Sequence, residues 1–215
     1  MQINNNNVPY LIGITGSYGS GKSLVGEILS NLGVYVIDTD HIVKEILVSE
    51  NDISKLIVKE FGNIICKNLA GEFIDRKKLA DIVFKDEVKR KRLESLVHPE
   101  VGKRLAVLIT GNKDKKVIAV LVPLLYEANL QGAYNETWCV TCKQEVQLNR
   151  LEKKGITREQ ALSRIKSQMP LEKKAALSDF VIENSSSEEN TKEQIKSRLK
   201  KLAQLSHNFH LFSGK

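Results

Sequence analysis

Aromatic residues are scarce in this chain of 215 residues, where phenylalanine, tryptophan and tyrosine together make up 6%. Proteins that bind single-stranded nucleic acids stack the bases on aromatic side chains placed among lysines and arginines. The basic segments of this sequence show no such interleaving. The composition therefore speaks against a nucleic-acid-binding protein.

Long apolar runs are absent as well, since no window approaches the roughly 18 consecutive apolar residues that a membrane helix needs. Residues 1–9 are polar and include a run of asparagines, so they lack the basic start and apolar stretch of a secretion signal. The three cysteines, Cys66, Cys139 and Cys142, cannot all pair within one chain. Because free thiols persist in reducing compartments, we expect a cytoplasmic protein.

Cys139 and Cys142 formally match a Cys-x-x-Cys pair. They lie in or next to residues 137–141, whose pattern predicts a strand, and residues three apart on a strand face opposite sides. A redox pair normally opens a helix, and a zinc site needs two further ligands. We therefore expect ordinary buried or half-buried cysteines.

The net charge of +7 predicts an anionic partner, either a nucleic acid or a phosphorylated metabolite. The excess is concentrated in two segments. Residues 143–174 hold nine Lys or Arg against four Glu, and residues 76–104 hold ten against five acidic residues. Such runs are also typical of solvated helix faces, and for any single lysine that interpretation stays open.

The chain opens with a strand, a glycine-rich turn, a helix and a second strand. Residues 10–14 form a short apolar run, and a helical pattern of apolar residues begins after Lys22. Gly33 is well placed to end this helix. Residues 34–38 then predict a buried strand.

Residues 41–108 are mostly helical in pattern, with an interruption at residues 62–73 that suggests a turn or hairpin. This connection is longer than a simple crossover helix, so we expect a helical, substrate-binding insertion. Further strands are predicted at residues 117–122, 137–141 and 179–182. Residues 145–170 form a basic helical segment broken near Gly155.

An amphipathic helix marked by Ile195, Leu199 and Leu202 closes the chain. Five strands separated by helices predict an α/β protein with three layers and a five-stranded parallel sheet. Together with the glycine-rich motif described next, this pattern predicts a P-loop NTPase fold. We expect one domain over residues 1–215, which includes the helical insertion and the basic helical segment at residues 145–170, which the family resemblance described below implies to be a helical lid.

The motif G-x-x-x-x-G-K-S/T lies between the first predicted strand and helix, which is the context that makes it specific. Its residues are Gly16, Ser17, Tyr18, Gly19, Ser20, Gly21, Lys22 and Ser23. The glycines let backbone N–H groups turn toward an anion at a helix N-terminus. Lys22 can reach the β- and γ-phosphates of a nucleotide, and the Ser23 hydroxyl can bind Mg²⁺. The alternative is a glycine-rich turn with an exposed lysine.

Other signatures of nucleotide-binding proteins are missing. A GTPase needs Asn-Lys-x-Asp, but residues 112–115 read Asn-Lys-Asp-Lys, and no D-x-x-G occurs. A motor ATPase usually carries an acidic residue directly after a central strand, whereas residues 117–122 are followed by Pro123. These absences weaken both interpretations and favour a small-molecule kinase.

Two carboxylates, Asp38 and Asp40, follow the second predicted strand at the edge where open α/β sheets bind ligands. They point in opposite directions if the strand persists. One could accept the proton of an acceptor hydroxyl, and the other could help hold Mg²⁺. The alternative is that they are acids that cap the next helix.

Several segments together resemble the dephospho-CoA kinase family over about residues 10–205. They are the P-loop, Val36-Ile37-Asp38-Thr39-Asp40, Asp75-Arg76-Lys77-Lys78-Leu79 with Ile82-Val83-Phe84, His98-Pro99, Val122-Pro123-Leu124-Leu125-Tyr126-Glu127, Gln147-x-x-Arg150, Arg164-Ile165-x-x-Gln168-Met169 and Asp179-Phe180-Val181-Ile182-x-Asn184. The resemblance implies ATP- and Mg²⁺-dependent phosphorylation of the ribose 3′-hydroxyl of dephospho-CoA, which gives coenzyme A.

The resemblance also implies roles for individual residues. Asp40 would be the base, Arg150 the lid arginine that closes over the phosphates, and Asn184 a neighbour of the adenine. The nucleotide loop would run on through Leu24. The acceptor site would be lined by Asp38, Arg76, His98, Pro123, Leu124, Leu125 and Glu127.

Each of these residues also has a simpler interpretation. His98 could cap or end a helix, Pro123 could only terminate a strand, and Glu127 could be solvated. Arg150 could be a surface arginine that pairs with Glu145 or Glu152.

The chain departs from the family at three places. Ser17 replaces a usual glycine, Leu24 replaces a threonine, and Lys153 and Lys154 stand where a second lid arginine is common. Two other functions stay open, namely another kinase of the same fold, such as a nucleoside monophosphate kinase, and a nucleotide-gated nucleic-acid-binding protein.

Overall fold

The computed structural model describes residues 8–67 and 73–205. The chain forms two compact units, which we describe separately. The P-loop unit comprises residues up to Asp38 and from Asn112 onward, and the helical unit comprises residues 39–111. Within the described residues, no helix combines the length and apolar character needed to cross a bilayer.

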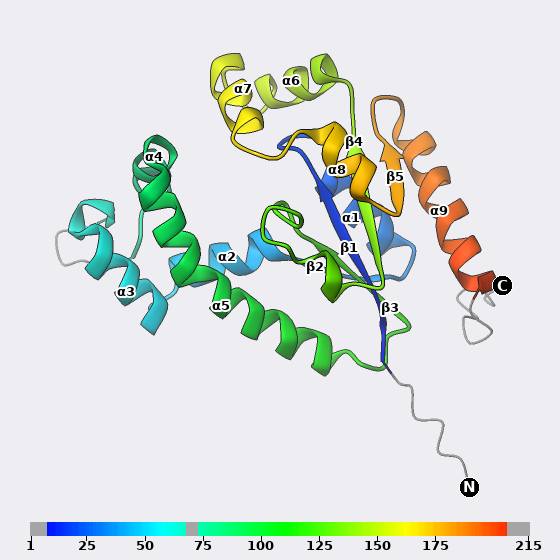
Figure 1. Ribbon diagram of the computed structural model, residues 1–215, viewed down its shortest axis with the longest axis horizontal. Helices are drawn as coiled ribbons and strands as arrows, with labels where there is room; N and C mark the ends of the chain where they lie inside the picture. The colour runs from blue at the N-terminus through cyan, green and yellow to red at the C-terminus, as the bar shows by residue number, and fades with distance from the viewer. Residues whose placement is uncertain (1–7, 68–72, 206–215) are drawn as a thin grey trace, which may run out of the picture. The chain divides into compact units, whose positions relative to one another are not determined.

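The P-loop unit is built on a five-stranded sheet in the order β2-β3-β1-β4-β5 (Figure 1). The strands are β1 (Tyr10–Gly16), β2 (Tyr35–Asp38), β3 (Val117–Leu121), β4 (Glu136–Thr141) and β5 (Phe180–Glu183). Every pairing is parallel, which confirms the predicted sheet. The order reverses direction beside β1, so the carboxyl end of β1 is the edge where this type of sheet binds ligands.

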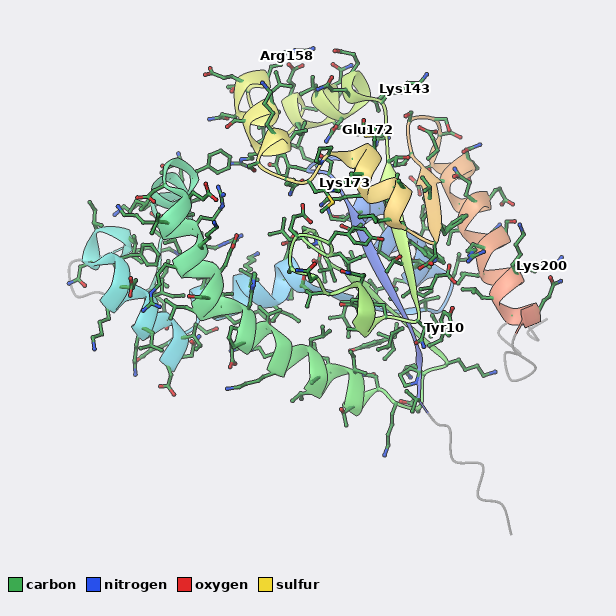
Figure 2. All side chains as sticks on the ribbon, viewed as in Figure 1. Tyr10, Lys143, Arg158, Glu172, Lys173 and Lys200 are labelled. Carbon is green, nitrogen blue, oxygen red and sulfur yellow. The ribbon has the colours of Figure 1, made fainter. Side chains whose placement is uncertain are left out.

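Helices cover both faces of this sheet and give the three layers (Figure 1). The helices of this unit are α1 (Lys22–Asn31), α6 (Gln144–Glu152), α7 (Arg158–Lys166), α8 (Leu171–Leu177) and α9 (Glu188–Leu205), with a short 3-10 turn, η2 (Gln131–Ala133). Of these, α1, α8 and α9 pack on the strands, whereas α6 and α7 lie beyond the carboxyl end of β4 (Figure 1). The main core lies between the strands, α1 and α9, with Trp138, Leu29 and Leu199 fully buried. Figure 2 labels Tyr10 at the amino end of β1 and Lys143 just beyond the carboxyl end of β4, which mark the two opposite edges of the sheet.

The helical unit contains α2 (Thr39–Val48), α3 (Asp52–Phe61), η1 (Asn63–Ile65), α4 (Arg76–Lys85) and α5 (Glu87–Gly111). An antiparallel bridge joins Cys66 to Ile74, as a hairpin requires, while residues 68–72 of the predicted turn lie outside the described residues. The binding role expected for this unit stays a prediction.

Pro99 lies inside α5, so the alternative that His98 ends a helix is wrong. The helical conformation is sterically disfavoured for the residue before a proline, and the proline itself has no backbone N–H to donate to the helix. However, α2, α3 and α4 all pack against α5. This tertiary packing outweighs the local preference of the dipeptide.

Candidate functional site

The glycine-rich loop connects β1 to α1 and depends on backbone conformations that only glycine adopts easily. Gly16 and Gly21 have φ angles of 155° and 107°. A Cβ atom on Gly21 would lie 1.9 Å from Asn184 Nδ2, and one on Gly16 would lie 2.6 Å from the Val140 carbonyl oxygen. The loop is therefore a tight cradle at the N-terminus of α1, where backbone N–H groups lack helical partners.

Lys22 is the first residue of α1, and its ammonium group donates a hydrogen bond to the Gly16 carbonyl oxygen at 3.3 Å. The lysine side chain thus runs back along the loop instead of out into solvent. Ser23, the next residue of α1, is exposed. Both residues lie where the motif requires a phosphate-binding cation and a hydroxyl ligand for Mg²⁺.

Asn184 is hydrogen-bonded to the backbone of the glycine-rich loop. Its amide Nδ2 donates to the Ser20 carbonyl oxygen at 2.8 Å, and its Oδ1 accepts from the Thr191 hydroxyl at 2.9 Å. The residue is fully buried directly after β5. This supporting role was not expected from the sequence, and the contact between Asn184 and adenine stays a prediction.

Arg150 brings an unsatisfied donor to this loop. Its Nη1 atom is buried and has no hydrogen-bond partner among the described residues, and it lies 3.5 Å from the position that a Cβ of Gly21 would take. The Ser20 hydroxyl of the same loop is likewise buried and unpartnered. Because a buried polar group without a partner is costly, two such groups beside a glycine cradle fit an anion bound there.

The simpler interpretation was that Arg150 pairs with Glu145 or Glu152 on the surface, and one of these two carboxylates has another partner. Glu145 forms an ion pair with Arg158 at 2.7 Å instead. Lys153 and Lys154 are exposed beyond the end of α6. Whether either replaces a second lid arginine stays open, as does the role of residues 145–170 as a lid.

The segment after β3 is held by a lysine that the sequence did not single out. Lys174 of α8 is fully buried, donates to the Pro123 carbonyl oxygen at 2.7 Å and forms an ion pair with Glu127 at 2.9 Å. The Thr15 hydroxyl also donates to the Pro123 carbonyl, at 3.1 Å. Pro123 therefore does more than end a strand.

Glu127 is an anchored carboxylate, so the alternative that it is solvated is wrong. Its Oε1 also accepts a hydrogen bond from the Met169 backbone at 2.9 Å, while its Oε2 is buried without a partner among the described residues. Leu124 is half-buried and Leu125 is fully buried beneath the turn. In the sequence, the Pro-Leu-Leu-x-Glu segment indicated a role for Glu127. The burial of Lys174 was indicated only by the apolar residues next to it.

The two acidic residues differ in their surroundings. Asp38 is the half-buried last residue of β2 and lies at the same sheet edge as the P-loop. Asp40 is exposed in the first turn of α2, inside the helix rather than before it. Since the strand ends at Asp38, the opposed orientation expected on a continuing strand does not apply. An acid in this first turn also favours the helix dipole.

Arg76 and His98 belong to the helical unit, where Arg76 is the first residue of α4 and His98 lies in α5. Both side chains are exposed. Their contact with an acceptor molecule stays a prediction.

Two departures in the loop have structural explanations. Ser17 is buried, has no positive φ, and its hydroxyl accepts a hydrogen bond from Gln147 Nε2 at 3.0 Å. Leu24 packs against the main core of the sheet. A serine at position 17 is therefore free of backbone strain, and a leucine at position 24 adds apolar contact.

The cysteines are buried and free, as expected. Burial raises the pKa of the Cys139 thiol to about 11 and also raises the pKa of Cys142. Thiols with raised pKa values are poor nucleophiles and poor metal ligands at neutral pH. Within the part of the chain that the structure describes, no three or more His, Cys, Asp and Glu side chains come together as a metal-binding group.

Comparison with known proteins gives one consistent result. The family model described as dephospho-CoA kinase matches residues 10–190. Among curated proteins, the dephospho-CoA kinase of Carboxydothermus hydrogenoformans is 42% identical and covers 89% of this chain and 93% of its own length. That of Oceanobacillus iheyensis is 39% identical and covers 89% and 96%.

Solved structures are similar to this chain as well. A Thermus thermophilus protein is 33% identical with a TM-score of 0.77, over 90% of this chain and 98% of its own. A dephospho-CoA kinase from Campylobacter jejuni is 26% identical with a TM-score of 0.63, over 90% and 97%. A shikimate kinase from Acinetobacter baumannii, 16% identical with a TM-score of 0.51 over 94% and 97%, shares the fold. The chain belongs to the dephospho-CoA kinase family.

Proposed function

We propose that this protein transfers the γ-phosphoryl group of ATP to the ribose 3′-hydroxyl of dephospho-CoA, which gives coenzyme A. The observation that carries the proposal is the pairing of a glycine cradle with a buried guanidinium nitrogen of Arg150, which has no hydrogen-bond partner among the described residues. Family membership supplies the acceptor, since the matching family model is that of dephospho-CoA kinase.

The loop and Arg150 hold and polarise the phosphates in this proposal. Backbone N–H groups at the start of α1 bind phosphate oxygens, and Lys22 exchanges its bond to the Gly16 carbonyl for the β- and γ-phosphates. Arg150 stabilises the charge that spreads over the transferred group. Fixed donors of this kind lower the barrier because they need no reorganisation during the reaction.

Asp40 is the proposed base. It follows β2 along the chain, and its exposed carboxylate is accessible to a hydroxyl group. It would orient the 3′-hydroxyl and accept its proton as the oxygen attacks phosphorus. Asp38, Arg76, His98 and the turn at residues 123–127 are proposed to line the acceptor site around that hydroxyl.

Mg²⁺ fits the oxygen donors at the sheet edge. Hard cations of this size take hydroxyl, carboxylate and phosphate oxygens, and the Ser23 hydroxyl and Asp38 carboxylate are such donors. When bound, the ion neutralises charge between the β- and γ-phosphates. We further propose that the protein acts in the cytoplasm and binds no nucleic acid, in line with its buried free thiols and its few aromatic residues.

The test is incubation of the purified protein with Mg²⁺-ATP and dephospho-CoA, followed by mass detection of coenzyme A. We expect stoichiometric ADP and coenzyme A, and no product with Lys22→Ala. AMP and other nucleoside monophosphates, offered as alternative acceptors, should react far more slowly. Turnover of a monophosphate in place of dephospho-CoA would contradict the proposal, and so would tight, salt-sensitive RNA binding without turnover.

A further inference from the structure

Three polar side chains from α6, α7 and the segment after α7 converge on two successive residues of the P-loop. Gln147 of α6 donates from Nε2 to the Ser17 hydroxyl at 3.0 Å and to the Tyr18 carbonyl oxygen. Gln168 accepts the Tyr18 backbone N–H through its Oε1 at 2.9 Å. The backbone of Tyr18 is thus bound on both its polar groups.

The third contact engages the Tyr18 side chain. Arg164 of α7 donates from Nη1 to the Tyr18 hydroxyl at 2.6 Å, and its guanidinium carbon lies 5.1 Å from the centre of the Tyr18 ring. A hydrogen bond from a charged donor is stronger than one between neutral groups. A cation–π contact is stronger when the cation is shielded from water than when it is exposed. Tyr18 also packs against the apolar cluster of α6 and α7 that contains Leu151 and Ala161.

These contacts matter because the loop has little stiffness of its own. Gly16, Gly19 and Gly21 all have positive φ, and glycine loses more conformational freedom on ordering than any other residue. Fixing Ser17 and Tyr18 from outside reduces the conformations open to the glycines on either side. The helical segment therefore contributes to the shape of the phosphate cradle.

The same contacts fix the position of α6. Gln147 and Arg150 are three residues apart on this helix, so they lie on one face. Leu151 of the same helix packs closely against Gly19, where an added Cβ would come within 2.9 Å of it. Contact between α6 and the loop at Gln147 and Leu151 thus places Arg150 beside Gly21.

We propose that Gln147, Arg164 and Gln168 are positioning residues that hold α6 and the loop together through Ser17 and Tyr18, and so hold Arg150 at the phosphate site. The catalytic consequence of this clamp rests on the proposed kinase function, whereas its effect on nucleotide affinity does not. None of the three side chains has to touch a substrate. Their removal should act through Arg150.

A double-mutant cycle tests this dependence. Gln168→Ala and Arg164→Ala are each made in the wild-type protein and in Arg150→Ala, and Tyr18→Phe serves as a milder change that keeps the ring beneath Arg164. Lys166→Ala is the matched control, because this lysine of α7 is exposed and lies two residues from both positions. ATP affinity is measured by calorimetry, turnover of dephospho-CoA by steady-state kinetics, and folding by thermal melting.

We expect Gln168→Ala and Arg164→Ala each to lower kcat by about ten- to a hundredfold, as small misplacements of a reacting group do. The KM for dephospho-CoA should barely change, since the acceptor is not bound by the clamp. In Arg150→Ala the same two changes should cost less than about threefold, because residues that act as one unit are not additive. ATP affinity should follow the same non-additive pattern. Each variant should still melt in one cooperative transition above the assay temperature, and Lys166→Ala should keep the kcat and ATP affinity of the wild-type protein.

Full additivity with Arg150→Ala, in kcat or in ATP affinity, would overturn the inference, because the residues would then act independently of Arg150. A rise in kcat on loss of Gln168 would also overturn it, since the clamp would then hold the enzyme back. If the wild-type protein binds ATP but makes no coenzyme A, the proposed function fails. In that case the ATP affinities alone test whether the clamp positions Arg150.

Discussion

Gly21 is the residue of the loop with the least room for a side chain. A Cβ there would lie 1.9 Å from Asn184 Nδ2, and the φ of 107° is strained for any other residue. Gly21→Ala should therefore displace Asn184 and weaken ATP binding by about a hundredfold or more, by the loss of positioned donors. Calorimetric titration with ATP measures the effect.

Gly102 provides the matched control for this change. It lies inside α5, and an added Cβ would meet no atom of the described residues within 4 Å. Gly102→Ala should leave ATP binding unchanged and stabilise the protein by up to about 1 kcal/mol, as alanine does in helices. Equal loss of ATP binding in both variants would contradict the account of the loop.

Asp40 carries the proton transfer in our proposal. Asp40→Asn keeps the shape of the side chain but removes its basicity, so kcat should fall by about 10²- to 10⁴-fold. The side chain is exposed, and the melting temperature should therefore hardly move. Asp52→Asn, in the first turn of α3, is the matched control and should keep full activity. An Asp40→Asn variant with wild-type turnover would remove Asp40 from the mechanism.

Lys174 is a buried charge whose value depends on its partners. Lys174→Met removes the ammonium group that pairs with Glu127 and donates to the Pro123 carbonyl oxygen, so unfolding should cost about 3 kcal/mol less, as for other broken buried pairs. Lys173→Met, at the exposed neighbour labelled in Figure 2, should change stability little. Urea unfolding gives both values.

The double variant Lys174→Met with Glu127→Gln sharpens this test. Removal of the charge on Glu127 relieves the penalty that Lys174→Met leaves behind, so the double variant should be more stable than the single one. A double variant that loses the sum of the two single effects would show that Glu127 and Lys174 are not coupled.

At the scale of elements, β1 holds a half-buried and β4 a buried ionisable group, and the protonation of both is linked to folding. Burial, and secondarily the charge of Glu136, raises the pKa of Tyr10 from 10.0 to about 12. Burial raises the pKa of Cys139 from 9.0 to about 11. Because the folded state holds these protons more tightly, their stabilising contribution is complete below pH 9 and is lost as the pH rises toward 12.

Variants of Tyr10 and Cys139 test how much these two strands contribute to a loss of stability at alkaline pH. Cys139→Ala should flatten the decline between about pH 9 and 11, and Tyr10→Phe should flatten it between about pH 10 and 12. Urea unfolding at pH 8, 10 and 11 measures how the free energy of unfolding changes with pH, and this slope does not depend on the stability of the variant at neutral pH. Slopes identical to that of the wild-type protein would show that these groups do not govern the alkaline transition.

The strands were predictable from the sequence because parallel strands buried on both faces are continuous apolar runs. β3 is an example, with all five residues buried. Proline is a weaker guide, as Pro99 shows, because packing around a long helix can outweigh a local preference. Local rules thus work where burial and backbone propensity agree.

The site itself was predictable only where its residues are adjacent in sequence. The P-loop follows from spacing alone, whereas the clamp joins residues far apart along the chain, such as Tyr18 with Gln168 and Ser17 with Gln147. Asn184 was singled out, but its bond to the loop backbone was not foreseen. Contacts of this kind depend on the order of strands in the sheet, which periodicity does not determine.

For the whole molecule, the positive charge acquires a more specific meaning than it had in the sequence. Within residues 143–174, Arg158 pairs with Glu145, Lys174 pairs with Glu127, and Arg164 lies against Tyr18. Three of the nine basic residues of this segment therefore make contacts within the P-loop unit. Arg150 is different, because its buried Nη1 has no partner among the described residues.

The central claim is that phosphate is transferred to one defined hydroxyl of dephospho-CoA. Tandem mass spectrometry and phosphorus NMR of the product locate the new phosphate directly. The account predicts a single phosphomonoester on the ribose 3′-oxygen, formed with one ADP per turnover and absent with Lys22→Ala. A phosphate on any other oxygen, or ATP consumption without a phosphorylated acceptor, would contradict it.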